Sequence, residues 1–240
     1  MTSESAPSFV CVECNANVPH ITFVHFGSIR LHICNKCGRV ADKYVEYELV
    51  TIMLDLLLHC KQAYSHVLHN LIPHHSAQNT RVELIRMALF SILLDACKKL
   101  NFSEHGVLFY RLFFASMMSF LAFIVGTLIA SVLVIKLLNG GYVKKAKNIN
   151  SHFGSYGLIT KVGILTSFAQ VGYIPMMIWD YPGEIIHTVS LFHFSSNMVG
   201  SKVALQCDGY IPALFVVGFG VICRTLCYRF ISLYAAPLLW

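Results

Sequence analysis

Charged side chains are scarce in this chain of 240 residues, since Asp, Glu, Lys and Arg together make up only 12% of it. Hydrophobic residues make up 56%, and the mean hydropathy is +0.62. A soluble globular domain carries roughly twice as much charge. The composition therefore favours a membrane protein. The net charge of +6 is modest, and no dense basic face of the kind that binds nucleic acid is present, so we expect no nucleic-acid partner.

Familiar catalytic patterns are also missing. The chain has no G-x-S-x-G, no H-E-x-x-H, no Walker phosphate loop and no H-x4-D pair of the acyltransferase kind. Several cysteines lack ligand-like spacing and are interpreted as small apolar fillers, namely Cys60, Cys97, Cys207, Cys223 and Cys227. We therefore expect a protein that is not an enzyme.

A secretory signal is the third absence. Residues Met1 to Val10 have neither a basic start nor an adequate apolar run, and we expect them to form a disordered tail. Proteins that stay in the cytosol keep their thiols reduced. This context disfavours disulfides as the explanation of the cysteines that follow.

Two C-x2-C pairs are the clearest motif that the chain contains. Nineteen residues separate the pair Cys11 and Cys14 from the pair Cys34 and Cys37. Each pair allows two sulfurs to face one ion, and two pairs complete a tetrahedral site. The alternatives are two disulfides or a thioredoxin-type redox motif, but the latter belongs beside a βαβ pattern. The spacing predicts a structural zinc ribbon, with short strands in T-F-V-H-F and I-R-L-H-I between the pairs.

A helix is predicted directly after the ribbon, with Asp42 as its N-cap. Its apolar stripe is expected to contain Val45, Leu49, Ile52, Leu56 and Cys60. Histidines near its end, including His66 and His69, are expected to lie at the surface.

The motifs from Cys11 to Asn70 together resemble the Arv homology domain. The cysteine pairs are followed by A-D-K-Y-V-E-Y (Ala41 to Tyr47), L-D-L-L-L (Leu54 to Leu58) and A-Y-S-H-V-L-H-N (Ala63 to Asn70). The resemblance covers about a quarter of the chain by motif. It implies a membrane protein of the endoplasmic reticulum that acts in sterol and sphingolipid homeostasis, with a link to glycosylphosphatidylinositol-anchor assembly.

The centre of that resemblance suggests a docking edge for a partner protein or a lipid headgroup. Its residues would be Asp42, Lys43, Tyr44, Glu46 and Tyr47. The alternative is a solvated helix start, because acidic side chains in the first turn suit the helix dipole.

Residues 71–111 are interpreted as a linker with a second amphipathic helix from Arg81 to Leu100. Arg86 and Asp95 leave only eight uncharged residues between them, too few to cross a bilayer. We expect this helix either to lie in the membrane surface or to pack against the zinc domain. Its apolar face would contain Val82, Ile85, Leu89, Ile92, Leu93, Ala96 and Leu100.

Residues 112–240 form the membrane domain, which makes the predicted fold class an α-helical multi-span membrane protein with a small N-terminal zinc-ribbon module. Four spans are predicted, at residues 112–135, 162–179, 185–205 and 212–233. Pro175 is expected to kink the end of the second. Polar groups are costly inside a span and face other helices or a cavity. His193 and Asn197 in the third are therefore candidates to line a cavity, and the alternative is a moderately polar helix packed in the bundle.

The orientation signals conflict. The loop after the first span is lysine-rich, which favours a cytosolic loop, whereas reduced thiolates favour a cytosolic N-terminal domain. We favour the cytosolic zinc domain, because amphipathic helices also use basic residues to bind anionic lipid. Glycosylation of the sequon at Asn101 would contradict this orientation.

Three functions remain open at this point. The first, implied by the resemblance, is transport or distribution of sterol between membranes. The second is a scaffold whose ribbon recruits lipid-metabolism or glycosylphosphatidylinositol-assembly enzymes and carries no lipid. The third is a membrane-embedded lipid enzyme that uses polar residues such as His187, His193 and Asp180.

Overall fold

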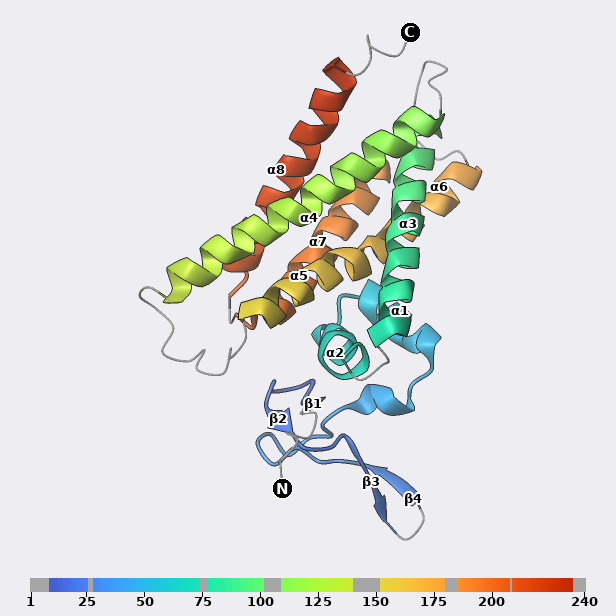
Figure 1. The fold of residues 1–240 in the computed structure, drawn as a ribbon. Coiled ribbons are helices and arrows are strands. Elements are labelled where there is room, and N and C mark those ends of the chain that lie inside the picture. The colour runs from blue at the N-terminus through green and yellow to red at the C-terminus, as the bar shows by residue number, and fades with distance from the viewer. Residues whose placement is uncertain are drawn as a thin grey trace. The chain divides into compact units, whose positions relative to one another are not determined.

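The computed structural model describes residues 9–25, 28–73, 77–101, 109–139, 152–179, 185–207 and 209–234. The chain divides into two compact units, Met1–Arg81 and Val82–Trp240. The first contains the strands and the helical segments up to residue 71, and the second contains the long helices (Figure 1).

Two small antiparallel hairpins build the ribbon of the first unit. β1 (Phe9–Val10) pairs with β2 (Asn17–Val18), and β3 (Thr22–His25) pairs with β4 (Ser28–Leu31). The second hairpin confirms the two strands predicted between the cysteine pairs. The first corrects the predicted tail, because Phe9 and Val10 are held in a strand; residues 1–8 lie outside the described part of the chain.

Short helical segments follow the ribbon, where the sequence predicted one continuous helix. They are η1 (Lys43–Glu46, a 3-10 helix), α1 (Leu49–Leu57), α2 (Lys61–Ser65) and η2 (His66–Leu71, a π-helical turn). The continuous helix is wrong at two points: Tyr47 and Glu48 have extended backbone between η1 and α1, and His59 adopts a left-handed φ of 60° between α1 and α2. The predicted stripe is only partly buried: Ile52 and Leu56 are in the core, whereas Leu49 is 66% exposed.

The second unit consists of helices. They are most of α3 (Ala77–Asn101), α4 (Phe109–Asn139), α5 (His152–Thr166), η3 (Ser167–Gly172, a 3-10 helix), α6 (Tyr173–Trp179), α7 (Ile185–Leu205) and α8 (Ile211–Tyr234). Figure 1 shows α4, in green, lying alongside α8, in red. Their close approach uses Gly126, where an added Cβ would lie 2.9 Å from the Cβ of Cys223. The packing of α4 on α8 therefore requires a residue without a side chain at this crossing.

Three segments among the described residues are long and apolar enough to cross a bilayer: Phe109–Leu137, Gly157–Trp179 and Ile211–Leu233. They correspond to the first, second and fourth predicted spans. The third predicted span forms helix α7 but does not meet this test of composition. The protein is therefore a multi-pass membrane protein in which three of the four predicted spans are supported by length and composition, and the span at residues 185–205 stays a prediction.

The second span is interrupted in its middle, before Pro175 and not at it. The 3-10 segment η3 separates α5 from α6, and Pro175 lies in the first turn of α6, where a proline removes no helical hydrogen bond. Backbone irregularity at membrane depth is tolerated where it is enclosed by protein. Ser167, Ala169 and Gln170 of η3 are indeed buried.

Helix α3 confirms the helix predicted from Arg81 to Leu100, but much of its predicted apolar face is exposed within the second unit. Ile85, Leu89 and Leu93 are 58%, 53% and 40% exposed, whereas Asp95 is only 3% exposed. Ile92 and Ala96 are the members of the predicted face that are buried. An outward apolar surface with polar groups inside suits a helix in contact with lipid.

Candidate functional site

The four cysteines predicted as ligands gather in one cluster in the first unit. Their sulfurs all lie within 4.8 Å of one another. The Cys11 and Cys37 sulfurs are 3.8 Å apart, and those of Cys14 and Cys34 are 3.7 Å apart. Four thiolates at the usual zinc–sulfur distance form a tetrahedron with edges of about 3.8 Å. The cluster could therefore hold one metal ion, and its distances exclude disulfide bonds.

Equivalent turns build the two halves of the cluster. Asn15 and Gly38 directly follow the second cysteine of each pair, with left-handed φ values of 56° and 70°. Their backbone N–H groups donate to the carbonyl oxygens of Cys11 and Cys34, at 2.9 and 2.8 Å. Asn and Gly adopt this conformation more readily than other residues. The local sequence therefore folds each C-x2-C pair into a turn with both sulfurs on one side.

Backbone hydrogen bonds and burial act in opposite directions on these thiols. Amides of Cys37 and Lys36 donate to the Cys34 sulfur and lower its pKa to about 7. Burial raises the pKa of Cys11 to about 12 and outweighs the amides of Cys14 and Glu13. Burial of a thiol next to other thiols favours its protonated form, and a bound cation reverses that preference.

The predicted docking residues divide into buried and exposed sets. Asp42 and Tyr44 are 0% and 1% exposed, so their side chains support the fold and present no surface to a partner. Asp42 accepts from the Tyr44 backbone N–H at 3.0 Å, which confirms its capping role, although it caps η1 and not a long helix. Lys43 is half-buried, and Glu46 and Tyr47 are exposed. The docking edge stays a prediction for these last three.

A buried polar network joins the ribbon to the helices of the first unit. The Asp42 carboxylate receives hydrogen bonds from His66 Nδ1 at 2.7 Å and Asn70 Nδ2 at 2.6 Å. Asn70 also exchanges two hydrogen bonds of 2.9 Å with the backbone of Val10 in β1. His66 is therefore buried, contrary to the surface position expected for it. The link could have been suggested by its motifs, since Asp42 and the pair His66 and Asn70 come from two different segments of the resemblance.

A second cluster of functional interest lies in the membrane unit. A cavity of about 390 Å³ lies between α3, α4, α7, α8 and the interrupted span. Its lining combines acidic, basic, hydroxyl and apolar side chains, which are Asp95, Lys98, Lys99, Ser119, Phe123, Gln170, Tyr173, Ser190, His193, Phe194, Asn197, Val217, Val221, Arg224, Thr225, Tyr228 and Arg229.

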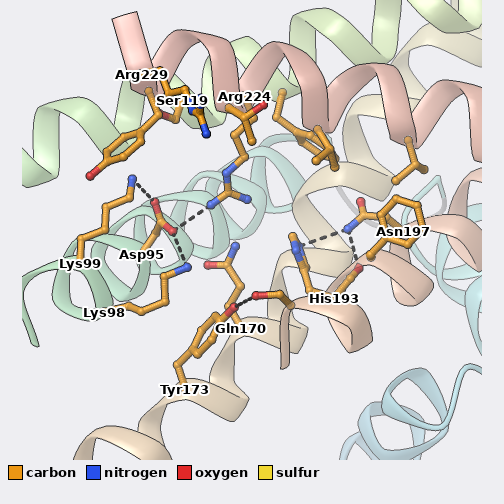
Figure 2. A pocket seen from close by; sticks show the side chains of 17 residues that line it. Asp95, Lys98, Lys99, Ser119, Gln170, Tyr173, His193, Asn197, Arg224 and Arg229 are labelled. Carbon is orange, nitrogen blue, oxygen red and sulfur yellow. Dashed lines mark hydrogen bonds and ion pairs between the residues drawn. The ribbon is translucent and has the colours of Figure 1, made fainter. Parts of the chain in front are cut away.

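Asp95 is the centre of the charged end of this cavity (Figure 2). It forms ion pairs with Arg224 at 2.9 Å, Lys98 at 3.2 Å and Lys99 at 2.7 Å. Burial alone would raise the pKa of Asp95, but the three cations hold it well below its usual range. The carboxylate therefore stays ionised and joins α3 to α8.

His193 and Asn197 line the other end of the cavity, away from Asp95 (Figure 2). Asn197 Nδ2 lies 3.2 Å from His193 Nε2, and Asn197 Oδ1 accepts from Thr166 at 2.7 Å. On the interrupted span, Gln170 accepts a hydrogen bond from Ser91 of α3 at 3.1 Å. Sequence reasoning singled out His193 and Asn197 but missed Asp95, Gln170 and Arg224, which lie far apart along the chain.

The residues named for an enzymatic alternative do not all meet. His193 lines the cavity, whereas His187 is exposed and is not part of the lining. Asp180 lies outside the described residues.

Comparison with known proteins places this geometry in context. A model of the Arv1-like family matches residues 10–200. The chain is 32% identical to "Protein arv1 homolog" of Dictyostelium discoideum, over 96% of this chain and 98% of that protein. It is 29% identical to "Protein ARV 2" of Arabidopsis thaliana, over 82% and 83%, and 24% identical to "Protein ARV1" of Homo sapiens, over 93% and 82%. No solved structure matches the chain.

Proposed function

The chain belongs to the Arv1-like family. On this premise we propose that it is a membrane protein of the endoplasmic reticulum and that it distributes sterol between membranes. Its role would extend to sterol and sphingolipid homeostasis and to glycosylphosphatidylinositol-anchor assembly, as the resemblance implies. The observation that carries the proposal is the single family match from residue 10 to residue 200, which includes both the ribbon and most of the membrane unit.

Zinc is the metal that we propose for the cysteine cluster. Four thiolates with tetrahedral spacing are a donor set that zinc prefers, and four protein ligands leave no open position for a substrate. The role of the site is therefore structural. The buried core around Cys11, Val18, Cys34 and Ala41 is small, and a module of this size depends on a metal to fold.

The cytosolic side is the location that we propose for this module, because the four ligands must remain reduced to bind a metal. We also propose that the protein acts without catalysis. The supporting observation is that His187, one of the residues considered for an enzyme, lies outside the cavity lining that contains His193.

The experiment that tests the function measures free sterol in the endoplasmic reticulum and plasma membrane of cells that lack the protein. The cells are rescued with wild type, with Cys34→Ser plus Cys37→Ser, or with Cys60→Ser plus Cys97→Ser. The last pair removes two thiols outside the cluster and serves as the matched control. We expect wild type and the control to restore the distribution and the ligand variant, expressed and correctly located, to fail. A normal distribution without the protein would contradict the proposal.

A scaffold is the second candidate, because Glu46 and Tyr47 are exposed beside the buried Asp42 and Tyr44. Such an edge could recruit lipid-metabolism or glycosylphosphatidylinositol-assembly enzymes. Saturable labelling of the purified protein by a photoreactive sterol separates the two candidates, since a scaffold binds none. A complementary variant, Glu46→Lys with Tyr47→Ala, should abolish rescue if the edge docks a partner. Arg30→Glu, at an exposed position on β4, is the control for a change of surface charge.

A further inference from the structure

The cavity of the membrane unit carries more positive charge than its own carboxylate neutralises. Four of its lining residues are cationic, Lys98, Lys99, Arg224 and Arg229, and one is acidic, Asp95. Arg229 is exposed and forms no ion pair with a carboxylate among the described residues, whereas the other three all pair with Asp95 and are only 16–21% exposed. One carboxylate therefore faces three partly buried cations. Charge buried without a counter-charge is strongly unfavourable. The cavity is therefore electrostatically suited to an anion.

Two of the cationic groups, Lys98 and Lys99, are held in place before any ligand arrives. The Lys99 ammonium donates to Ser116 at 3.0 Å and lies 4.2 Å from the centre of the Tyr228 ring. The Lys98 ammonium lies 4.5 Å from the centre of the Tyr173 ring. The side chains of Lys98 and Lys99 are only 20% and 16% exposed, respectively. Such preorganised donors lose little conformational entropy when they bind an anion.

Donor groups remain for a ligand even with the internal ion pairs formed. The Arg224 guanidinium has five N–H groups, and its hydrogen bond to Asp95 involves the single nitrogen Nη2, at 2.9 Å. Arginine recognises phosphate in a bidentate manner. The hydroxyls of Ser119 and Thr225, which line the same cavity, already donate to the carbonyl oxygens of Ala115 and Ile222. The free N–H groups of arginine therefore carry the preference, and they favour a phosphate over a neutral alcohol.

The apolar part of the lining indicates that the phosphate belongs to a lipid. Phe123, Phe194, Val217 and Val221 line the same space as the charged residues. Arg224 lies nine residues before Leu233, the end of the last span, which places it about 14 Å along the helix from that end. Arg229 is closer to the end. Arg229 therefore lies toward one membrane surface and Arg224 near the middle of the span, so that the charged lining extends inward from that surface, and Val217 and Val221 lie farther from it.

We propose that this cavity binds the phosphate of an anionic membrane lipid, with Arg224 and Arg229 as its direct ligands and Asp95 as the group that positions Arg224. This site goes beyond the proposed sterol function and does not depend on it. The volume of about 390 Å³ suits a headgroup with part of its glycerol and not a whole lipid.

The test uses the purified full-length protein and a photoreactive phosphatidic acid as the probe. Competitors are unlabelled phosphatidic acid, diacylglycerol with the same chains, inorganic phosphate and cholesterol. We expect saturable labelling that only phosphatidic acid displaces, with crosslinked peptides from α7 or α8. Diacylglycerol differs from phosphatidic acid only in lacking the phosphate, so equal displacement by both would overturn the proposal.

The remaining outcomes also decide the question. Displacement by inorganic phosphate at the same concentration would show a site for a free anion, and displacement by cholesterol alone would show a sterol site. Crosslinks confined to residues 9–73 would place the binding in the first unit. Each of these results overturns the proposal. All of them use the unmodified chain, so the proposal remains testable whether or not a variant folds.

Variants then identify the residues. Arg229→Gln leaves all three ion pairs of Asp95 in place, and we expect about tenfold weaker binding because one charged hydrogen bond is lost. Arg86→Gln is the matched control, since it removes the same charge from an exposed position of α3 that pairs with Glu83 at 2.7 Å. Equal affinity of Arg229→Gln and wild type would exclude Arg229 as a ligand.

Discussion

The two units of this protein use buried polar groups in different ways. In the first unit, Asp42 binds His66, Asn70 and the Tyr44 amide, and the network joins segments 24 and 28 residues apart within the unit that also holds the metal-ligand cluster. In the second unit, Asp95 meets Arg224 from a helix 129 residues away, and the charges line a cavity. The comparison teaches that a satisfied network supports a fold, whereas one with surplus charge can also bind a ligand.

Removal of the metal should produce the largest difference in stability between the two units. Stripping the metal with a chelator, or Cys34→Ser with Cys37→Ser, should unfold the ribbon, since structural zinc contributes about 10 kcal/mol or more to such modules. Hydrogen exchange resolved by peptide is the measurement. We expect protection to disappear over residues 9–41 and to persist in α4, which is the internal control. Unchanged protection of the ribbon after the metal has been removed would show that it folds without an ion.

Asp95→Asn should be the most damaging single change in the second unit. It leaves Lys98, Lys99 and Arg224 without their counter-charge, and the loss of one partner of a buried ion pair costs about 3–5 kcal/mol. Thermal unfolding of the purified protein in detergent would measure the effect. Glu83→Gln is the matched control, because its surface pair with Arg86 contributes at most about 1 kcal/mol. Similar losses for both variants would contradict a special role for Asp95.

Acid should weaken the second unit through the same residue. The pKa of Asp95 is lower in the folded protein than in the unfolded chain, where an aspartate titrates near 3.9. The stabilisation is therefore fully present above about pH 4 and is lost as the pH falls from there toward the lower folded-state pKa. Unfolding between pH 7 and pH 3 should show a steeper loss for wild type than for Asp95→Asn. Parallel curves would argue against Asp95 as the source.

Asp42→Asn should test the network of the first unit in the same manner. It removes a charged acceptor that serves His66, Asn70 and the Tyr44 amide, so we expect a loss of about 2–3 kcal/mol. Hydrogen exchange of η2 and of β1 would report it, with the membrane helices unaffected. The exposed substitution Glu46→Gln is the control and should change stability by less than about 0.5 kcal/mol.

The smallest predicted effect concerns helix packing. Gly220→Ala places a Cβ 3.1 Å from the Phe123 ring and against Thr127, and such overpacking costs about 1–3 kcal/mol. Gly218→Ala, two residues away on α8, meets nothing within 4 Å and should be nearly neutral. The difference between their unfolding temperatures measures the tightness of the α4 and α8 contact. Equal unfolding temperatures for the two variants would mean that the contact between α4 and α8 accommodates an added methyl group without cost.

Local sequence patterns predicted the cysteine cluster and the strands of the first unit correctly, but they did not predict where its helices are interrupted. The cysteine spacing located the metal-ligand cluster, and alternation located β3 and β4, because both depend on neighbouring residues. The continuous helix failed at Tyr47 and Glu48, which are extended, and at His59, whose left-handed backbone has no strong sequence signal. In the second unit, hydropathy found three spans, whereas the broken helix at Ser167–Gly172 depends on the helices that enclose it.

The sequence by itself determined the four-cysteine cluster, the multi-pass membrane class and the candidates His193 and Asn197, because ligand spacing, long apolar runs and polar residues within them are local properties of a chain. Only the tertiary structure decided that Asp42 and Tyr44 are buried and that Asp95, Gln170 and Arg224 share a cavity. These residues are brought together by helix packing, and the cost of an unpaired buried charge appears only when the neighbouring charges are known.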